Sequence, residues 1–419
     1  MSVVEIEVLA FSSKPPYRPV SAAKKSRLLV FGMEPTSVDP EGKRLDPASV
    51  ALDESSRLES PASWLRSTLL GAALRRASVH PDEHSRGDPL RVLVWGIGGG
   101  CDVITSLALA RTLAALLDGR PRDISASSAS RREKHRRHLL CRLSDGTTVQ
   151  FDVASSQSLR SLDRLQPYID SGEAELRHFD GHCQLVPRVG SSGPVGAGAR
   201  RAAKGKRRRA DDDKWGDDPT VIVSRSIAAL TARSAPEEGA VVLVALDKGD
   251  SASEREDKHA RAAHDLLSRW DLVLAVDAGG DSVTGGVDHA AGDAASGVDM
   301  QALSVVARSG LPYQHLVVGP GCDAESAAAR LGSELAARNG GWWFTPARHM
   351  DEMRLLASPL GEDRTPNVMW RAWLASASTK CPATLEVERS GRKQAIPVAW
   401  LCSTAVVRPA GLAECTPLL

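Results

Sequence analysis

Three glycine-rich segments of this chain are each followed by an aspartate, and each comes directly after a run of apolar residues. They are Gly-Gly-Gly-Cys-Asp at 98–102, Ala-Gly-Gly-Asp-Ser at 278–282 and Gly-Pro-Gly-Cys-Asp at 319–323. Glycine allows positive backbone φ, and it leaves the N–H groups at a helix start accessible to an anion, most often a phosphate. Carboxylates bind Mg²⁺ and accept hydrogen bonds from ribose hydroxyl groups. The pattern therefore predicts a small-molecule site.

The aspartates of these segments are expected to share one cleft, because parallel strands end at the same edge of a sheet. Asp102, Asp281 and Asp323 are the candidate catalytic and metal-binding residues, and Asp277 lies close behind them. Two carboxylates about 4 Å apart repel by about 4 kcal/mol at an effective dielectric near 20, so three cannot converge unpaired. A Mg²⁺ ion shared with substrate phosphate oxygens would satisfy the carboxylates and the glycine amides together. The glycines expected to contact the ligand are Gly96, Gly98, Gly99, Gly100, Gly279, Gly280, Gly319 and Gly321.

Helix capping is a competing explanation for two of these aspartates. Asp102 and Asp323 stand where helices are expected to begin, and an aspartate N-cap stabilises a helix by about 1 kcal/mol without any ligand. Capping and ligand contact can hold at the same residue. Asp281 precedes a segment that is not expected to start a helix. Helix capping therefore explains an aspartate at this position less well than contact with a ligand does.

Three further residues near these turns have weaker signals. Lys248 follows the strand expected at 240–246 and would reach a phosphate there, although an exposed, solvated lysine is the commoner case. Cys101 and Cys322 fit small buried packing better than nucleophilic chemistry, even though a helix N-terminus lowers the pKa of a thiol.

Alternating strand and helix patterns predict a doubly wound, mostly parallel α/β sheet of the Rossmann-like type. Strands are expected at 91–95, 220–224, 240–246, 272–276 and 313–318, and helices at 63–77, 104–117, 259–270, 299–305 and 324–338. A hairpin at 138–153 is expected to be an insertion or an edge of the sheet. A second hairpin, formed by 384–387 and 395–407, is expected to close the domain.

The chain divides into four parts by composition. Residues 1–88 are expected to be an N-terminal extension, and residues 89–185 and 219–415 to be the two parts of the α/β domain. Between them, residues 186–218 are rich in glycine and basic residues and are expected to be a disordered insertion. Its basic run at 200–209 fits a solvated loop better than a nuclear-import or nucleic-acid patch.

Overall composition excludes several classes of protein. The 419 residues carry 53 Lys and Arg against 52 Asp and Glu, which gives no case for nucleic acid or an acidic partner. The seven cysteines include no Cys-x-x-Cys pair, which argues against structural zinc or a disulfide framework. No segment approaches the roughly 18 apolar residues of a membrane span. We therefore expect a cytoplasmic protein that binds a small molecule, with nuclear import through 200–209 as the alternative; the oligomeric state is not indicated.

The three turns together resemble an uncharacterised, mainly archaeal and bacterial group, the domain-of-unknown-function family eleven-fifty-two. Its members carry a Gly-Ile-Gly-Gly-Gly-Gly-Asp-Val-Val turn, a Val-Asp-x-Gly-Gly-Asp turn and a Gly-x-Gly-x-Asp-Gly-Glu turn. The resemblance covers about residues 89–415, with Cys101 and Ala324 standing where the family has glycine. It implies a nucleotide-binding-like α/β fold and no known reaction.

These observations favour an enzyme that binds a phosphorylated or nucleotide-like small molecule, with Mg²⁺ as a candidate cofactor. A second interpretation is that the first turn binds the dinucleotide NAD or binds S-adenosylmethionine. Against the dinucleotide, the first turn lacks the complete Gly-x-Gly-x-x-Gly pattern, and no acidic residue follows at a second strand end about 20 positions later. A third interpretation is a non-catalytic ligand sensor or scaffold whose basic insertion contacts a partner.

Overall fold

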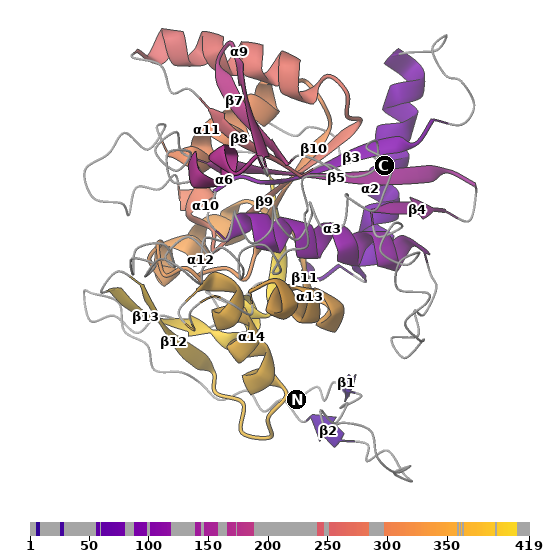
Figure 1. Ribbon diagram of the computed structural model, residues 1–419. Helices are drawn as coiled ribbons and strands as arrows, with labels where there is room; N and C mark the ends of the chain where they lie inside the picture. Colours follow the sequence, from indigo (N-terminus) through magenta and orange to yellow (C-terminus); the bar gives the residue numbers. More distant parts are fainter. Residues whose placement is uncertain are drawn as a thin grey trace, which may run out of the picture.

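A ten-stranded mixed sheet with helices on both faces forms the centre of the computed structural model (Figure 1). The structure describes residues 6–8, 26–28, 56–58, 60–79, 88–98, 101–118, 139–143, 146–157, 166–172, 174–187, 241–246, 251–284, 297–357, 360, 362, 364–389 and 392–408. The predicted Rossmann-like α/β fold is confirmed. The strand expected at 220–224 and almost all of the expected insertion lie outside these residues.

Within this part of the chain, no helix combines the length and the apolar composition that crossing a membrane requires.

Five parallel strands make up the middle of the sheet. They are β3 (Leu90–Gly96), β5 (Thr148–Gln157), β8 (Val241–Leu246), β9 (Leu272–Ala278) and β10 (Tyr313–Val318). Their spatial order is β8-β5-β3-β9-β10. In chain order this is 3-2-1-4-5, the Rossmann arrangement, so the strand order reverses between β3 and β9. Ligands of open α/β sheets bind at that reversal, outside the carboxyl ends of the strands.

Antiparallel strands extend the sheet on both sides. β14 (Ser403–Val407) and β11 (Asn339–Phe344) follow β10, while β7 (His182–Pro187) and β6 (Ala174–Phe179) follow β8, and β4 (Leu140–Arg142) pairs with β5. Two separate pairs are β1 (Ile6–Val8) with β2 (Ser26–Leu28), and β12 (Thr384–Arg389) with β13 (Arg392–Pro397).

The hairpin predicted at 138–153 forms, but its expected place as an insertion or edge is wrong. Its second strand, β5, lies between β3 and β8 in the middle of the sheet. β5 lies in the middle because both of its faces are buried: Phe151 and Val153 pack in the core on one face of the sheet, and Ala154 packs in the core on the other. The polar residues that end the strand, Ser155 and Ser156, are buried as well.

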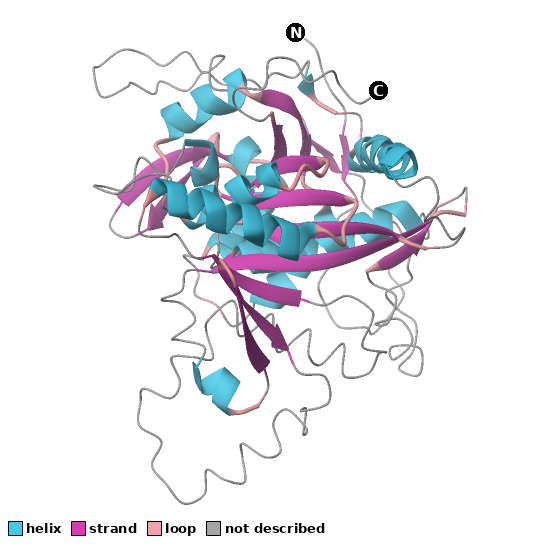
Figure 2. Ribbon diagram, turned by 90° about the horizontal axis from the view of Figure 1, so that it is seen from above, coloured by secondary structure: helices cyan, strands magenta, loops and turns pink. Residues whose placement is uncertain are grey.

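Helices form a layer on each face of the sheet. On one face lie α3 (Asp102–Asp118), α12 (Ala328–Ala337), α13 (Ala347–Ala357) and α14 (Thr365–Ser376), and on the other lie α9 (Ala252–Leu267) and α11 (Val298–Arg308). The remaining helices are α2 (Pro61–Val79), which packs against α3, and the short α6 (Gln166–Asp170), α10 (Asp281–Thr284) and α15 (Val398–Leu401). Figure 2 looks onto the sheet from the side of α9 and α11.

Strand β3 shows how the sequence builds these two layers. Val92 and Val94 belong to the core beneath α3, whereas Leu93 and Trp95 belong to the core beneath α9 and α11. A strand that is buried on both faces reads as a continuous apolar run, which is why it could be recognised from the sequence. Its carboxyl end is therefore held in place from both sides.

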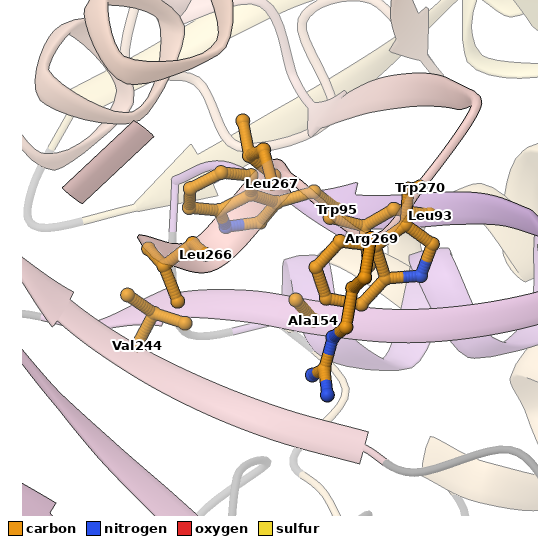
Figure 3. Close-up of a pocket in the computed structure, with 8 residues that line it drawn as sticks. All are labelled: Leu93, Trp95, Ala154, Val244, Leu266, Leu267, Arg269 and Trp270. Carbon is orange, nitrogen blue, oxygen red and sulfur yellow. The ribbon is translucent and has the colours of Figure 1, made fainter. Parts of the chain in front are cut away.

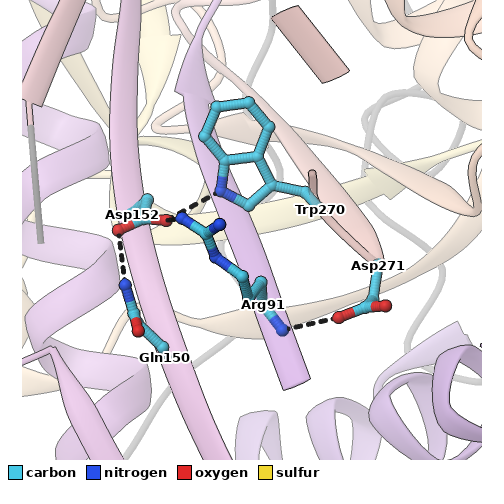
Figure 4. A network of polar contacts seen from close by, with 5 residues as sticks. All are labelled: Arg91, Gln150, Asp152, Trp270 and Asp271. Carbon is cyan, nitrogen blue, oxygen red and sulfur yellow. Dashed lines mark hydrogen bonds and ion pairs between the residues drawn. The ribbon is translucent and has the colours of Figure 1, made fainter. Parts of the chain in front are cut away.

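A polar network fixes the opposite end of β3 against its neighbours (Figure 4). The buried carboxylate of Asp152 accepts hydrogen bonds from the Trp270 indole at 2.8 Å, the Arg91 guanidinium at 2.9 Å and the Gln150 side-chain amide at 3.1 Å. The backbone N–H of Arg91 donates to the Asp271 carboxylate at 2.8 Å, and the N–H of Asp271 donates to the Arg91 carbonyl at 2.9 Å. The network thus sets the register of β3 relative to β9.

The C-terminal hairpin forms only in part as expected. β12 and β13 pair as predicted, but residues 398–401 form α15, and β14 returns to the main sheet beside β10. The hairpin holds the third glycine turn through Gln394, whose side-chain N–H group donates to the carbonyls of Ala324 at 3.0 Å and Ser326 at 2.9 Å. The Gln394 side-chain oxygen accepts from the N–H of Ala328 at 2.9 Å.

We predict that Asp152→Ala lowers the free energy of unfolding by about 2–4 kcal/mol, because it leaves the buried Trp270 N–H and the half-buried Arg91 guanidinium without their acceptor. Urea unfolding measures the change. Asp180→Ala is the control, since Asp180 forms an exposed ion pair with Arg261 and such pairs contribute about 0–1 kcal/mol. Equal losses in both variants would contradict this role of the network.

Candidate functional site

The three glycine turns meet at the carboxyl ends of β3, β9 and β10; the first two flank the point where the strand order reverses, and the third lies beside them. The N–H of Gly321 in the third turn donates to the carbonyl of Gly279 in the second turn at 2.6 Å. The N–H of Ala278 in the second turn donates to the carboxylate of Asp102, which follows the first turn, at 3.3 Å. The expectation that the turns share one edge of the sheet is confirmed.

Asp102 joins the first turn to the second. It is the first residue of α3, and only 6% of it is exposed. One of its carboxylate oxygens accepts from the N–H of Gly98 at 2.8 Å, and the other accepts from Ala278. The Gly98 N–H group, expected to face an anion, is therefore engaged by a carboxylate of the protein. Gly99 and Gly100 lie outside the described residues.

Asp277 is the most deeply buried carboxylate of the group, with 1% exposed. Its oxygens accept from the backbone N–H groups of Gly280 at 3.2 Å and Ser282 at 3.1 Å, and from the Ser282 hydroxyl. The Ser282 oxygen lies 2.9 Å from Nε2 of His315, a buried residue of β10. Asp277 is thus held by its own turn and supported from the next strand.

Asp299 is a site residue that the sequence did not single out. It lies in the first turn of α11, and its carboxylate reaches the first glycine turn: a Cβ atom on Gly98 would stand 2.1 Å from Oδ1 of Asp299. A side chain at position 98 would therefore displace this carboxylate. The carboxylate oxygens of Asp102, Asp277 and Asp299 lie within 4.8 Å of one another, and these residues are called the inner triad below.

Asp281, Asp323 and Glu325 form a second set of carboxylates within 4.8 Å of one another, called the outer triad. Asp281 and Glu325 are partly exposed, whereas Asp323 is buried. A Cβ atom on Gly279 would lie 2.0 Å from the Asp323 carboxylate, so this glycine, at φ +126°, also makes room for an acidic group. The predicted set of Asp102, Asp281 and Asp323 is therefore divided between two triads.

Two expectations about helix starts are wrong. Asp281 does begin a helix, the four-residue α10, because the turn after β9 closes directly into it. Asp323 does not begin one, since α12 starts only at Ala328. Instead, Asp323 accepts from the N–H of Glu325 at 3.1 Å within a loop in which Ala324 has a φ of +54°. The left-handed backbone at Ala324 is the conformation that glycine takes most readily.

The other predicted glycines have packing roles. A Cβ atom on Gly96 would lie 2.8 Å from the backbone oxygen of Asp102, so this glycine lets α3 approach β3 closely. Added Cβ atoms at Gly280, Gly319 and Gly321 would collide with packed side chains of the core. Contact between these four residues and a ligand stays a prediction.

The electrostatics of the inner triad favour protons or a cation. Burial, and then the negative charges of Asp277 and Asp281, hold the pKa of Asp102 well above its ordinary value. Burial and the neighbouring Asp281 raise the pKa of Asp277 to about 8. The pKa of Asp299 is also raised well above its ordinary value, by burial and then by the other three carboxylates. Among the described residues, the charges that raise these three pKa values are all negative, and the pKa of about 8 at Asp277 means that without a bound cation the triad retains a proton near neutral pH.

The two cysteines near the turns fit packing roles. Cys322 is buried, and burial followed by the charge of Asp323 raises the pKa of its thiol well above the ordinary value, which fits packing rather than nucleophilic attack. Cys101 is buried as well. Lys248 lies outside the described residues.

A small apolar cavity lies away from the carboxylates, between the sheet and α9 (Figure 3). Its lining residues are Leu93, Trp95, Ala154, Val244, Leu266, Leu267, Arg269 and Trp270. Its volume of about 10 Å³ is room for about one water molecule. It is therefore a packing gap and is too small for a substrate.

Comparisons of the chain with family models, with curated proteins and with solved structures found no match. The resemblance to the domain-of-unknown-function family eleven-fifty-two therefore stays a prediction.

We predict that the metal-free protein loses stability as the pH rises from about 4 to about 8. Asp277 has a folded-state pKa of about 8 against an ordinary value of 3.8, so between these values the folded chain binds a proton that the unfolded chain has lost. For one proton the slope is up to about 1.4 kcal/mol per pH unit. Thermal unfolding in chelator-treated buffers measures it, and Asp277→Asn should reduce the slope. A slope unchanged by Asp277→Asn would contradict the assignment.

Proposed function

We propose that this protein is an enzyme that binds a phosphorylated or nucleotide-like small molecule, together with Mg²⁺, at the carboxyl ends of β3, β9 and β10. The observation that carries the proposal is the convergence of two carboxylate triads at the carboxyl ends of the parallel strands, the inner triad at the reversal of strand order between β3 and β9 and the outer triad beside it, after β9 and β10. This is the position at which open α/β sheets bind their ligands.

The carboxylates decide which ligand can approach. The carboxylates at this edge of the sheet repel an anionic ligand unless a cation lies between the ligand and the carboxylates. Mg²⁺ is commonly held by one or two carboxylates and by the phosphate oxygens of a substrate. The partly exposed Asp281 and Glu325, with Asp323 behind them, are the groups that would face such a complex.

The bound cation would also determine the chemistry. Mg²⁺ polarises a phosphoryl oxygen and stabilises charge that develops in the transition state. Metal-assisted transfer or hydrolysis at a phosphate ester is therefore the reaction class that the site fits best. In this proposal Asp281 and Asp323 hold the cation and Asp102 orients the first turn against the second.

A site for NAD or S-adenosylmethionine is the second candidate, and the 3-2-1-4-5 strand order favours it. Two observations count against it. The second strand of that order, β5, ends in Ser155, Ser156 and Gln157, where a dinucleotide site places an acidic residue for the ribose. In addition, the N–H of Gly98 already donates to Asp102 and is not directed at a pyrophosphate.

We predict that ATP or a simple phosphate ester stabilises the protein only when Mg²⁺ is present. Ligand at about 100 times its Kd adds about 2.7 kcal/mol to the free energy of unfolding. Thermal shifts with ATP, NAD, S-adenosylmethionine and phosphate esters, each with and without Mg²⁺, measure this. Asp323→Asn should abolish the Mg²⁺-dependent part of the shift.

Glu388→Gln is the matched control, because Glu388 is an exposed residue of the C-terminal hairpin that pairs with Lys393. It should leave the shift unchanged. If NAD or S-adenosylmethionine stabilises the protein equally with and without Mg²⁺, the result would support the NAD or S-adenosylmethionine site and overturn the Mg²⁺-dependent phosphate site. The absence of a shift with every ligand would favour a scaffold protein.

A further inference from the structure

The geometry points to the inner triad of Asp102, Asp277 and Asp299 as a binding site for one divalent cation of the Mg²⁺ and Mn²⁺ class, which the protein holds before any substrate arrives. This site is separate from the outer triad, which meets the substrate. The role of the cation in catalysis rests on the proposed function, whereas its binding does not.

The first observation is the arrangement of three buried carboxylates on three different elements. Asp102 comes from α3, Asp277 from β9 and Asp299 from α11, and none is more than 9% exposed. Their oxygens lie within 4.8 Å of one another. Oxygen ligands on opposite sides of Mg²⁺, each at 2.0–2.1 Å, stand about 4.2 Å apart. Small side-chain movements would therefore bring all three carboxylates to one ion.

The second observation is an unsatisfied oxygen. Oδ1 of Asp299 is buried and has no hydrogen-bond partner among the described residues. It is directed at Gly98, beside Oδ2 of Asp102, which would lie 2.7 Å from an added Cβ at that position. A buried carboxylate oxygen without a partner is costly, and such groups call for an ion or a water molecule. A cation between Asp299 and Asp102 would supply the missing partner.

The third observation is that the other two carboxylates are already oriented. Asp102 is held by the N–H groups of Gly98 and Ala278, and Asp277 by those of Gly280 and Ser282. Both oxygens of Asp102, and the Asp277 oxygen that accepts from Gly280, each keep a further lone pair for a cation; the other Asp277 oxygen accepts from both the N–H and the hydroxyl of Ser282. Behind Asp277, the Ser282 hydroxyl connects to His315, the kind of supporting contact that fixes the orientation of metal ligands.

The donor set selects the class of metal. All three ligands are carboxylates, and the triad contains neither histidine nor cysteine. Carboxylate oxygens suit Mg²⁺, Mn²⁺ and Ca²⁺, whereas Zn²⁺ and Cu²⁺ sites are typically built with imidazole or thiolate. The alternative occupant is a set of shared protons, which would relieve the same repulsion without a metal.

The test is direct Mn²⁺ binding to the full chain in buffer free of phosphate and nucleotide, at pH 8. Electron paramagnetic resonance measures the free ion, and Mg²⁺ serves as the competitor. We expect one Mn²⁺ per chain at the inner triad. Asp299→Asn should weaken this binding at least about tenfold, since even residues that only support metal ligands cost 10–100-fold when they are changed. Gly98→Ala should weaken it as well, because the new methyl group displaces the Asp299 carboxylate.

Two further variants separate the sites. Asp265→Asn is the matched control, since Asp265 is exposed on α9, and it should bind Mn²⁺ like the parent chain. Asp323→Asn changes the outer triad and should alter the binding at the inner triad less than about threefold. Removing a negative charge from the buried inner triad relieves repulsion, so Asp299→Asn is expected to fold, and circular dichroism checks this.

The outcomes distinguish this inference from the proposed function. Mn²⁺ binding that depends on Asp299 supports the inner site even if no nucleotide or phosphate ester binds. Mn²⁺ binding that depends on Asp323 and not on Asp299 overturns it, and so does the absence of Mn²⁺ binding, which would leave shared protons as the occupants. A Mg²⁺-dependent nucleotide effect without Mn²⁺ binding at the inner triad would support the proposed function alone.

Discussion

Repulsion between buried carboxylates is the constraint on which this structure depends. Two such groups about 5 Å apart repel by about 3–4 kcal/mol at an effective dielectric near 20, and the inner triad contains three. Folding stability is only about 5–15 kcal/mol in total, so a chain retains such a cluster only if something offsets it. Backbone N–H groups of the first two turns offset part of the repulsion at Asp102 and Asp277, and a proton or a cation must supply the rest.

The sheet is what brings these groups together and keeps them in place. β3 and β9 are buried on both faces, and the Asp152 network fixes their amino ends, so their carboxyl ends have little freedom to separate. The third turn is held from outside the sheet, by Gln394 of the C-terminal hairpin. Apolar packing and hydrogen bonds that lie away from the site thus hold the acidic groups close to one another.

The sequence predicts the part of the site that local pattern controls. Apolar runs followed by glycine identified β3, β9 and β10, and parallel strands must end at one edge, so the meeting of the three turns followed from topology. Asp299 was missed because it stands at an ordinary helix start and reaches the site only across the packing of α11 on the sheet. The positions at which α10 and α12 begin, Asp281 and Ala328, depend on how tightly the preceding turns close. The central place of β5 depends on the residues that cover both of its faces. Neither is a property of local sequence.

Asp102 changes what a glycine turn at this position can bind. In Rossmann folds the first glycine turn directs its N–H groups at a pyrophosphate. Here the N–H of Gly98 donates to a carboxylate of the protein, and the space that a side chain at position 98 would fill is taken by the carboxylate of Asp299. The glycine makes room for protein carboxylates where the usual fold makes room for a phosphate. We therefore propose that this edge of the sheet prefers a cation to an anion, and that a phosphate would bind here only together with a cation.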